Sequence, residues 1–272
     1  MKISLALGGG AGLGWTHIGV LRAIDESPLE IAAISGTSIG AIAGASYAAG
    51  KLDYLEETAR TANFRTLLRF MDPHFKRGAV MGARTIEKEL DAQLGDLGFE
   101  DLEIPVAAVA ADLRTGDTII MQTGRLVPAI RASMSLPGIF RPVEYDGRLL
   151  VDGGAALPVP VSPARQLAPD ALCLSVNLQD DFTNRAEVAG IAETGGKHPN
   201  SISIVRASVG LSLRNLGRYS LALDPPDFAL SPPVGHIDMQ NFTRAEELIE
   251  IGHRETQASS PEILERLKKT SA

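Results

Sequence analysis

The chain has 272 residues, and 44% of them are hydrophobic, which is enough to build the core of one large α/β domain or two small ones. Its formal net charge of −7 argues against a nucleic-acid partner, because phosphate binding would require a basic face. Cys173 is the only cysteine, which excludes an intramolecular disulfide and a cysteine-based metal site.

The beginning of the chain predicts a βαβ unit with two glycine-containing turns. Residues 3–7 predict a strand, residues 8–14 a glycine loop and residues 15–26 a helix. A second apolar strand begins at Ile31 and leads into the turn 36–40, after which small apolar residues predict a buried helix. We expect the crossover between the two strands to be right-handed.

The turn Gly36-Thr-Ser-Ile-Gly40 matches the G-x-S-x-G pattern of a nucleophile elbow. Ser38 is at its apex, and the glycines two residues to either side remove Cβ atoms that would collide in so tight a turn. The helix that begins at Ile39 would direct free N–H groups and its positive end toward an oxyanion formed at Ser38. Because the pattern also occurs by chance, the hypothesis requires further catalytic parts elsewhere in the chain.

The first glycine loop, Gly8 to Gly14, lies between a strand and a helix, which is an arrangement that can bind an anion. It has no strict match to the dinucleotide-binding pattern, and it lacks the Lys-Ser/Thr pair that a P-loop needs after its last glycine. Bare backbone N–H groups without a lysine suit a single oxyanion better than a polyphosphate.

Residues 52–60 and 85–94 predict helices, and the stretch between them is basic and amphipathic, above all over 64–77. Two interpretations of this stretch stay open: a helix that covers the core with its charges in solvent, or a lid or interfacial face that meets lipid headgroups. No run approaches the roughly 20 apolar residues of a membrane span. The apolar run at the N-terminus is too short for a signal-peptide core. We therefore expect a cytoplasmic protein; the second interpretation of residues 64–77 adds a peripheral contact with the membrane surface.

The middle of the chain predicts further strands, over residues 104–111, 118–122, 143–145 and 148–151, and a short helix over 126–133. Asp146-Gly147 is its strongest hairpin signal, joining the last two of these strands. Asp152-Gly153-Gly154 follows immediately.

The rest of the chain predicts helices over 162–168 and 201–216, strands over 171–177 and 227–230, and one or two terminal helices over 242–269, interrupted at Ser260-Pro261. Residues 179–200 are charged, glycine-rich and weakly hydrophobic, which is typical of a mobile loop. We expect one domain over 1–272, with its core in 1–180, a mobile loop over 181–200 and helices over 201–272 that complete it.

A serine nucleophile needs a proton acceptor, which in most G-x-S-x-G hydrolases is a histidine oriented by a carboxylate. Among the five histidines, only His236 fits the α/β-hydrolase order, and no residue near it has the pattern of a positioned base. Asp152 is the better candidate, because it ends a strand and the two following glycines leave its carboxylate uncrowded. An isolated Asp-Gly-Gly sequence is also typical of an ordinary turn.

The glycine loop, the elbow and the Asp-Gly-Gly turn follow one another along the chain. In this order they resemble the motifs of the patatin-like phospholipase family. The resemblance runs from Ile3 to about Asn177 and is closest to short bacterial members, which are similar to the catalytic domain of neuropathy target esterase. It implies a three-layer α/β/α sandwich with a mainly parallel central sheet, which the alternating strands and helices allow. It also implies hydrolysis of a lipid or other acyl ester without a metal or a cofactor.

Residue by residue, the resemblance implies a Ser–Asp dyad without histidine, in which Ser38 is the nucleophile and Asp152 the base. It implies an oxyanion hole formed by the backbone N–H groups of Gly9, Gly10, Ala11 and Ile39. The glycines that support these motifs are Gly8, Gly14, Gly36, Gly40, Gly153 and Gly154. The stretch 131–140 resembles the family's segment leading into the aspartate strand.

Three positions depart from the family's pattern. Ala11 stands in place of the second motif glycine but keeps its N–H group. Leu13 stands where an arginine or lysine is usual, which removes a cation that could support the oxyanion or bind an anionic headgroup. Leu157 replaces an asparagine that is common after the Asp-Gly-Gly turn. The alternative function is therefore a non-catalytic lipid- or partner-binding protein on the same fold.

Overall fold

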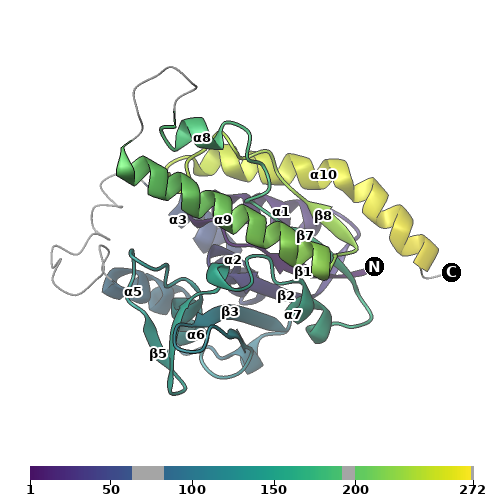
Figure 1. The fold of residues 1–272 in the computed structure, drawn as a ribbon. Helices are drawn as coiled ribbons and strands as arrows, with labels where there is room; N and C mark the ends of the chain where they lie inside the picture. Colours follow the sequence, from purple (N-terminus) through teal and green to yellow (C-terminus); the bar gives the residue numbers. More distant parts are fainter. Residues whose placement is uncertain (63–82, 192–199, 271–272) are drawn as a thin grey trace.

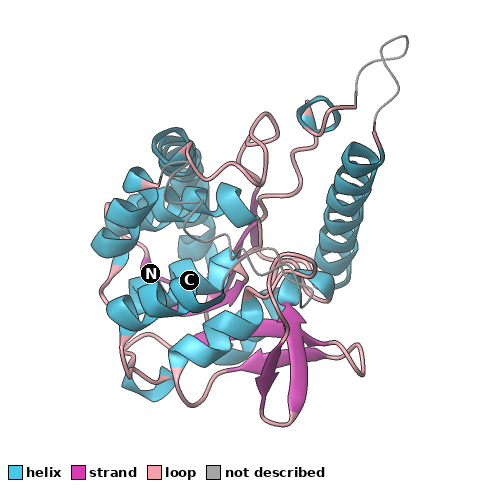
Figure 2. Ribbon diagram, turned by 90° about the vertical axis from the view of Figure 1, so that its left-hand side faces the viewer, coloured by secondary structure: helices cyan, strands magenta, loops and turns pink. Residues whose placement is uncertain are grey.

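The computed structural model describes residues 1–62, 83–191 and 200–270. Within them, one mixed sheet is covered by helices on both faces (Figures 1 and 2). The strands are β1 (Lys2–Leu7), β2 (Glu30–Thr37), β3 (Val106–Asp112), β4 (Thr118–Met121), β5 (Val143–Tyr145), β6 (Arg148–Asp152), β7 (Leu172–Val176) and β8 (Phe228–Leu230).

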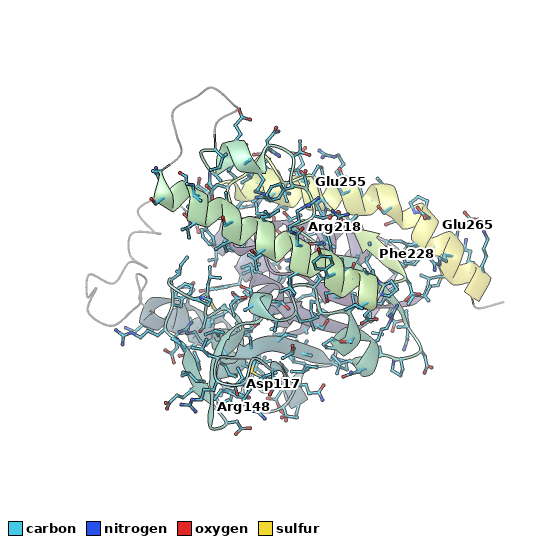
Figure 3. The ribbon with its side chains drawn as sticks, in the orientation of Figure 1. Asp117, Arg148, Arg218, Phe228, Glu255 and Glu265 are labelled. Atoms are coloured by element: carbon cyan, nitrogen blue, oxygen red, sulfur yellow. The ribbon has the colours of Figure 1, made fainter. Side chains whose placement is uncertain are left out.

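The sheet has the strand order β5-β6-β3-β2-β1-β7-β8, and β4 pairs with β3. The strands from β3 to β8 in this order pair in parallel, whereas β4, β5 and β6 form antiparallel pairs at the other edge. Asp117 and Arg148 mark that edge in Figure 3, at the opposite end of the molecule from Glu255 and Glu265. The predicted three-layer sandwich with a mainly parallel sheet is confirmed.

The helices are α1 (Thr16–Asp25), α2 (Ile39–Ala48), α3 (Leu52–Thr61), α5 (Ala83–Leu94), α6 (Leu126–Ser133), α7 (Val161–Leu167), α8 (Arg185–Val188), α9 (Ser201–Leu223) and α10 (Ala245–Thr270). Short 3-10 turns are η1 (Ala11–Trp15), η3 (Phe99–Asp101) and η4 (Gly153–Ala155). In the part of the chain that the structure describes, none of these helices is long and apolar enough to cross a membrane.

The core lies on both faces of β1 and β2 and is built mainly from aliphatic side chains. Helix α1 packs closely on α10 because two glycines allow their backbones to approach. A Cβ atom at Gly19 would lie 1.9 Å from the Ile249 carbonyl oxygen, and one at Gly252 would lie 2.1 Å from the Thr16 carbonyl oxygen. The C-terminal helix therefore completes the layer that covers the first βαβ unit.

The largest differences from the prediction are in three helices. Helix α9 continues past residue 216 to Leu223, and α8 forms one helical turn within the segment predicted as a mobile loop. Helix α10 runs through Pro261 without interruption, because residues beyond the proline, such as Ile263 and Leu267, are buried against the core. The basic stretch 64–77 and residues 192–199 lie outside the described residues.

Candidate active site

Ser38 occupies a strained turn between β2 and α2. Its φ of 58° and ψ of −121° are unusual for a residue with a side chain. The turn accepts no side chain at its flanking positions, since a Cβ atom at Gly36 would lie 2.4 Å from the Ala41 nitrogen and one at Gly40 would lie 2.1 Å from the Leu7 carbonyl oxygen. The serine side chain therefore projects from a fixed backbone at the N-terminus of α2.

Asp152, the last residue of β6, meets this serine. The Ser38 hydroxyl donates to Asp152 Oδ2 at 2.5 Å, and the Gly154 N–H donates to Asp152 Oδ1 at 2.8 Å. Only 4% of Asp152 is exposed. Burial raises its pKa from the ordinary 3.8 to about 6, although both hydrogen bonds act to lower it. The carboxylate is thus a stronger base than an exposed aspartate.

Ser133, at the end of α6, connects the elbow to the neighbouring strand. Its fully buried hydroxyl accepts the Ser38 N–H at 2.9 Å and donates to the Val109 carbonyl oxygen at 2.6 Å. Two residues further on, the Ser135 carbonyl oxygen accepts the Asp152 N–H at 3.0 Å. The three residues from Ser133 to Ser135 therefore accept hydrogen bonds from the backbone N–H groups of both dyad residues. The sequence motifs placed this stretch within the segment 131–140 that leads into the aspartate strand, but they gave neither serine a role.

The predicted oxyanion-hole residues fall into two groups. The Gly9 N–H donates to the Pro158 carbonyl oxygen at 3.0 Å and is therefore engaged within the fold. Within the described residues, the N–H groups of Gly10, Ala11 and Ile39 donate to no acceptor. Ala11 takes a left-handed φ of 48°, a conformation that the usual glycine would adopt more easily.

The predicted supporting glycines all lie in crowded backbone. A Cβ atom would come within 2.1 to 2.8 Å of a neighbouring atom at five of them, Gly8, Gly14, Gly36, Gly40 and Gly153. At Gly154 the nearest atom is Asp152 Oδ1, 3.0 Å away. The glycines thus allow the elbow, the first loop and the aspartate turn to pack together.

The two leucines that depart from the family's pattern lie in different surroundings. Leu13 is completely buried in the core, so the position that would usually carry a cation points into apolar surroundings. Leu157 holds the site through its backbone, since its carbonyl oxygen accepts the Thr37 hydroxyl at 2.8 Å and its N–H donates to the Gly153 carbonyl oxygen.

A large cavity of about 530 Å³ opens at Ser38. Its lining is mainly apolar and includes Ala11 and Ile39 beside the serine. The other contributors come mainly from α2, α3, α5, the loop after α6, α9 and the segment before α10; its apolar members include Trp15, Ile42, Leu55, Leu90, Met134, Leu136, Ile139, Phe140, Val205, Val209, Leu213, Met239 and Phe242. Such a pocket suits an aliphatic chain next to the hydroxyl.

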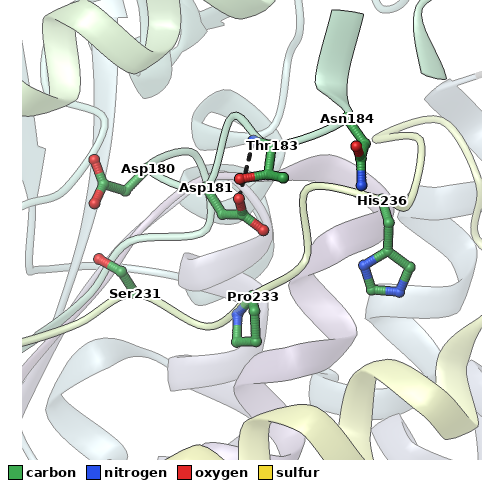
Figure 4. A pocket seen from close by; sticks show the side chains of 7 residues that line it. All are labelled: Asp180, Asp181, Thr183, Asn184, Ser231, Pro233 and His236. Atoms are coloured by element: carbon green, nitrogen blue, oxygen red, sulfur yellow. Dashed lines mark hydrogen bonds between the residues drawn. The ribbon is translucent and has the colours of Figure 1, made fainter. Parts of the chain in front are cut away.

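Within the part of the chain that the structure describes, no histidine takes part in the dyad. His17 is buried beneath the glycine loop, its Nε2 lies 2.7 Å from the Gly8 carbonyl oxygen, and burial lowers its pKa to about 4. A neutral ring therefore donates to that carbonyl. His236 Nε2 lies 2.9 Å from a Glu247 carboxylate oxygen. His236 also lines a separate polar pocket, with Asp180, Asp181, Thr183, Asn184, Ser231 and Pro233 (Figure 4).

The described residues contain no group of three or more histidine, cysteine, aspartate or glutamate side chains placed to hold a metal ion. The Asp181 carboxylate in the polar pocket instead accepts hydrogen bonds from the backbone: one from the Thr183 N–H (Figure 4) and one from the Gly235 N–H. The chemistry available at Ser38 comes from one hydroxyl, one buried carboxylate and the adjacent N–H groups.

A mostly parallel sheet with a serine elbow after one strand and an acidic turn after another defines the patatin type of α/β/α protein. The family model described as patatin-like phospholipase matches residues 5–165, and the chain belongs to this family. The resemblance predicted from the sequence motifs is thereby confirmed.

The relatives include proteins of the neuropathy target esterase group. An uncharacterized NTE family protein of Mycobacterium tuberculosis is 40% identical over 177 residues, 65% of this chain and 49% of that protein. Neuropathy target esterase sws of Drosophila melanogaster is 32% identical, over 66% of this chain and 13% of that protein. Lysophospholipase NTE1 of Cryptococcus neoformans is also 32% identical, over 68% and 12%. The chain thus spans at most about half the length of these relatives.

A solved structure has the same fold. The structure of VipD from Legionella pneumophila matches with a TM-score of 0.60 at 12% sequence identity, covering 97% of this chain and 67% of that one. At this identity the similarity concerns the fold alone.

Proposed function

We propose that the protein is a serine acyl-ester hydrolase that acts on lipids through a Ser38–Asp152 dyad. The observation that supports this most directly is the 2.5 Å hydrogen bond from the hydroxyl of Ser38, which lines an apolar cavity, to the buried Asp152 carboxylate. Membership of the patatin-like phospholipase family supports the same reaction class, as do the names of two relatives, one an esterase and the other a lysophospholipase.

In the proposed reaction, the Ser38 oxygen attacks the ester carbonyl carbon while Asp152 takes the hydroxyl proton. The negative charge that develops on the carbonyl oxygen is stabilised by the N–H groups of Gly10, Ala11 and Ile39. When the C–O bond to the alcohol breaks, the alcohol leaves with the proton from Asp152. Water then attacks the acyl-serine and gives a proton to the same carboxylate, and collapse releases the fatty acid and restores the Ser38 hydroxyl.

The lining of the cavity supports a proposal for the substrate class. Its lining is apolar next to the serine, and the two arginines in its wall already have partners within the protein. Arg185 donates to the Ile237 carbonyl oxygen, and Arg206 pairs with Asp238. With Leu13 in place of a cation, the site offers little charge to an anionic headgroup. We therefore propose esters with an aliphatic acyl chain, with lysophospholipids, the class that the fungal relative's name indicates, as the first to test.

The test is hydrolysis of p-nitrophenyl acyl esters and of a lipid panel by the wild type, Ser38→Ala and Asp152→Asn. We expect each variant to lose at least about 10³-fold in kcat, because each removes a group that acts in the chemical step. Asp117→Asn is the matched control, since Asp117 is exposed in the turn before β4. Wild-type rates in either dyad variant would refute the mechanism.

A fluorophosphonate probe separates the enzyme from the alternative, a non-catalytic lipid- or partner-binding protein. We expect the probe to label the wild type at Ser38 and to leave Ser38→Ala unlabelled, because only an activated serine reacts with it. A wild-type protein that binds fatty acid but is neither labelled nor active would favour the binding protein.

A further inference from the structure

Helix α9 presents an apolar face to solvent. Six of the nine large hydrophobic side chains that are exposed in the described residues belong to it, with exposed fractions from 45% to 88%. They are Ile204, Val205, Val209, Leu211, Tyr219 and Leu223. The remaining exposed positions of the helix carry small or hydroxyl side chains and one arginine, Arg218.

These side chains form a stripe rather than a scatter. At 3.6 residues per turn, the exposed positions from Ile204 to Leu223 fall within about half of the helix circumference, and 23 residues extend over roughly 35 Å. Figure 2 shows α9, the helix that follows the upper grey segment, standing at one side of the molecule with its outer surface unobstructed. A patch of this kind marks an interaction surface on a water-exposed protein.

The apolar stripe is continuous with the Ser38 cavity. Val205 and Val209 are exposed and at the same time line the cavity, and the next inward positions, Gly210 and Leu213, line it as well. A lipid chain could therefore pass from the outer surface of α9 to the serine along apolar side chains.

The charges on α9 are all of one sign. The helix contains three arginines and no acidic residue, although the chain as a whole has a net charge of −7. Arg206 pairs with Asp238, and Arg214 donates to the Asp180 carbonyl oxygen and lies over the Phe182 ring.

These contacts attach the inner side of the helix to the domain. Arg218 is exposed on the front of α9 (Figure 3), and the described part of the chain gives it no ion-pair partner.

We propose that the outer face of α9 docks on the surface of a lipid bilayer that contains anionic lipid, with the mouth of the cavity opening at the contact. This face consists of aliphatic side chains, a tyrosine and one arginine, and it has no carboxylate. Such a composition is typical of a helix that lies in the headgroup region of a bilayer. A second copy of the chain on the same face would cover the rim formed by Val205 and Val209, whereas a bilayer both covers that rim and supplies substrate. The substrate role rests on the proposed function; the docking itself does not.

The experiment is sedimentation of the full chain with vesicles of phosphatidylcholine, with and without phosphatidylglycerol. A triple variant, Leu211→Gln, Tyr219→Ser and Leu223→Gln, changes three exposed side chains that do not line the cavity. We expect it to bind vesicles at least about tenfold more weakly, because apolar area no longer leaves water. Arg218→Gln should weaken binding only to vesicles with phosphatidylglycerol, by about fivefold. Leu113→Gln, an exposed leucine outside α9, is the matched control and should bind like the wild type.

A soluble ester, p-nitrophenyl butyrate, is measured in parallel and reports the cavity without a bilayer. Vesicle binding that is lost in the triple variant while butyrate hydrolysis persists supports docking through α9. If the wild type hydrolyses no ester but its vesicle binding is still lost in the triple variant, the proposed function fails and the docking stands. Wild-type protein that stays in the supernatant, or a triple variant that sediments like the wild type, overturns the docking. A wild-type dimer in analytical ultracentrifugation that the same substitutions dissociate, without vesicle binding, does so too.

Discussion

The floor of the cavity and the helix at its mouth are built in opposite ways. On the floor, Ser38, Asp152 and Ser133 come from three elements, and their polar atoms are joined by hydrogen bonds of 2.5 to 2.9 Å in buried surroundings. At the mouth, α9 makes polar contacts with the domain through two arginines, packs Leu221 against a core cluster and exposes its outer apolar side chains to solvent. The first region holds the reacting atoms in place, and the second offers an apolar surface for contact.

This contrast matches two different requirements. Proton transfer from a serine to a carboxylate needs a fixed geometry, and the fold maintains it although the φ of Ser38 and the burial of Asp152 both cost free energy. Entry of a lipid needs a surface that can approach a bilayer, where rigid polar contacts would be a hindrance. If this is right, substitutions at Ser38, Asp152 and Ser133 should affect one another's geometry strongly, and substitutions on α9 should leave that geometry nearly unchanged.

The largest effect concerns stability and Asp152. The pKa of Asp152 in the folded protein is about 6, above the ordinary 3.8, so the folded state binds this proton up to a higher pH than the unfolded state does. The free energy of unfolding therefore falls as the pH rises from about 3.8 to about 6. The loss amounts to about 3 kcal/mol in total, and it is complete above pH 6. Asp152→Asn should not show it, whereas Asp117→Asn should. Urea unfolding of the three proteins between pH 4 and pH 8 measures the difference; parallel curves for the wild type and Asp152→Asn would show that Asp152 is not buried as described.

Ser133→Ala tests the coupling inside the floor. The substitution leaves the Ser38 N–H and the Val109 carbonyl oxygen without this partner, at a cost of about 1–3 kcal/mol. We expect kcat for a soluble ester to fall by about tenfold to a hundredfold with KM nearly unchanged, because the nucleophile is displaced while the cavity remains. Ser135→Ala is the matched control: its hydroxyl is equally buried but donates to the Arg131 carbonyl oxygen. Equal losses of kcat in both variants would indicate a general structural effect.

The pH dependence of the reaction tests the same carboxylate in the working enzyme. A base must be ionised, so kcat/KM should rise with pH and reach a plateau above the pKa of Asp152, about 6. At pH 5 the rate should be about tenfold below the plateau. A pH–rate profile with p-nitrophenyl butyrate, together with circular dichroism to verify folding at low pH, provides the measurement. An inflection of the pH–rate profile near pH 4, about the ordinary pKa of a hydrated aspartate, would show that the base is exposed to water.

A feature of this site could be predicted from the sequence when residues close to it in the chain determine it. The elbow and the Asp-Gly-Gly turn were predictable because glycines at short spacing determine the backbone around Ser38 and Asp152. The contacts of Ser133 were not, because its partners Ser38 and Val109 are 95 and 24 residues away and meet it only through the sheet topology. The engagement of the Gly9 N–H by a distant carbonyl oxygen has the same origin.

The helix lengths show the same limit. Helix α9 ends at Leu223, just before Asp-Pro-Pro, whereas the prediction stopped seven residues earlier, directly before Gly217, a residue that the helix passes through. The prediction of an interruption at Pro261 was too strict, since burial beyond the proline stabilises a continuous α10. The exposed face of α9 could be recognised only once its neighbours were known, because the same apolar spacing is typical of a helix packed on a core.

The smallest expected effect is at the mouth, where Arg206→Gln removes the ion pair with Asp238. Both side chains are about one-third exposed, so the pair should contribute less than about 1 kcal/mol to the free energy of unfolding. Arg254→Gln, which removes an exposed pair with Glu255 on α10, is the matched control and should behave similarly. If Arg206→Gln instead destabilised the protein as much as Ser133→Ala in the same urea titration, α9 would be part of the rigid floor, and the division between a fixed site and a loosely attached surface would not hold.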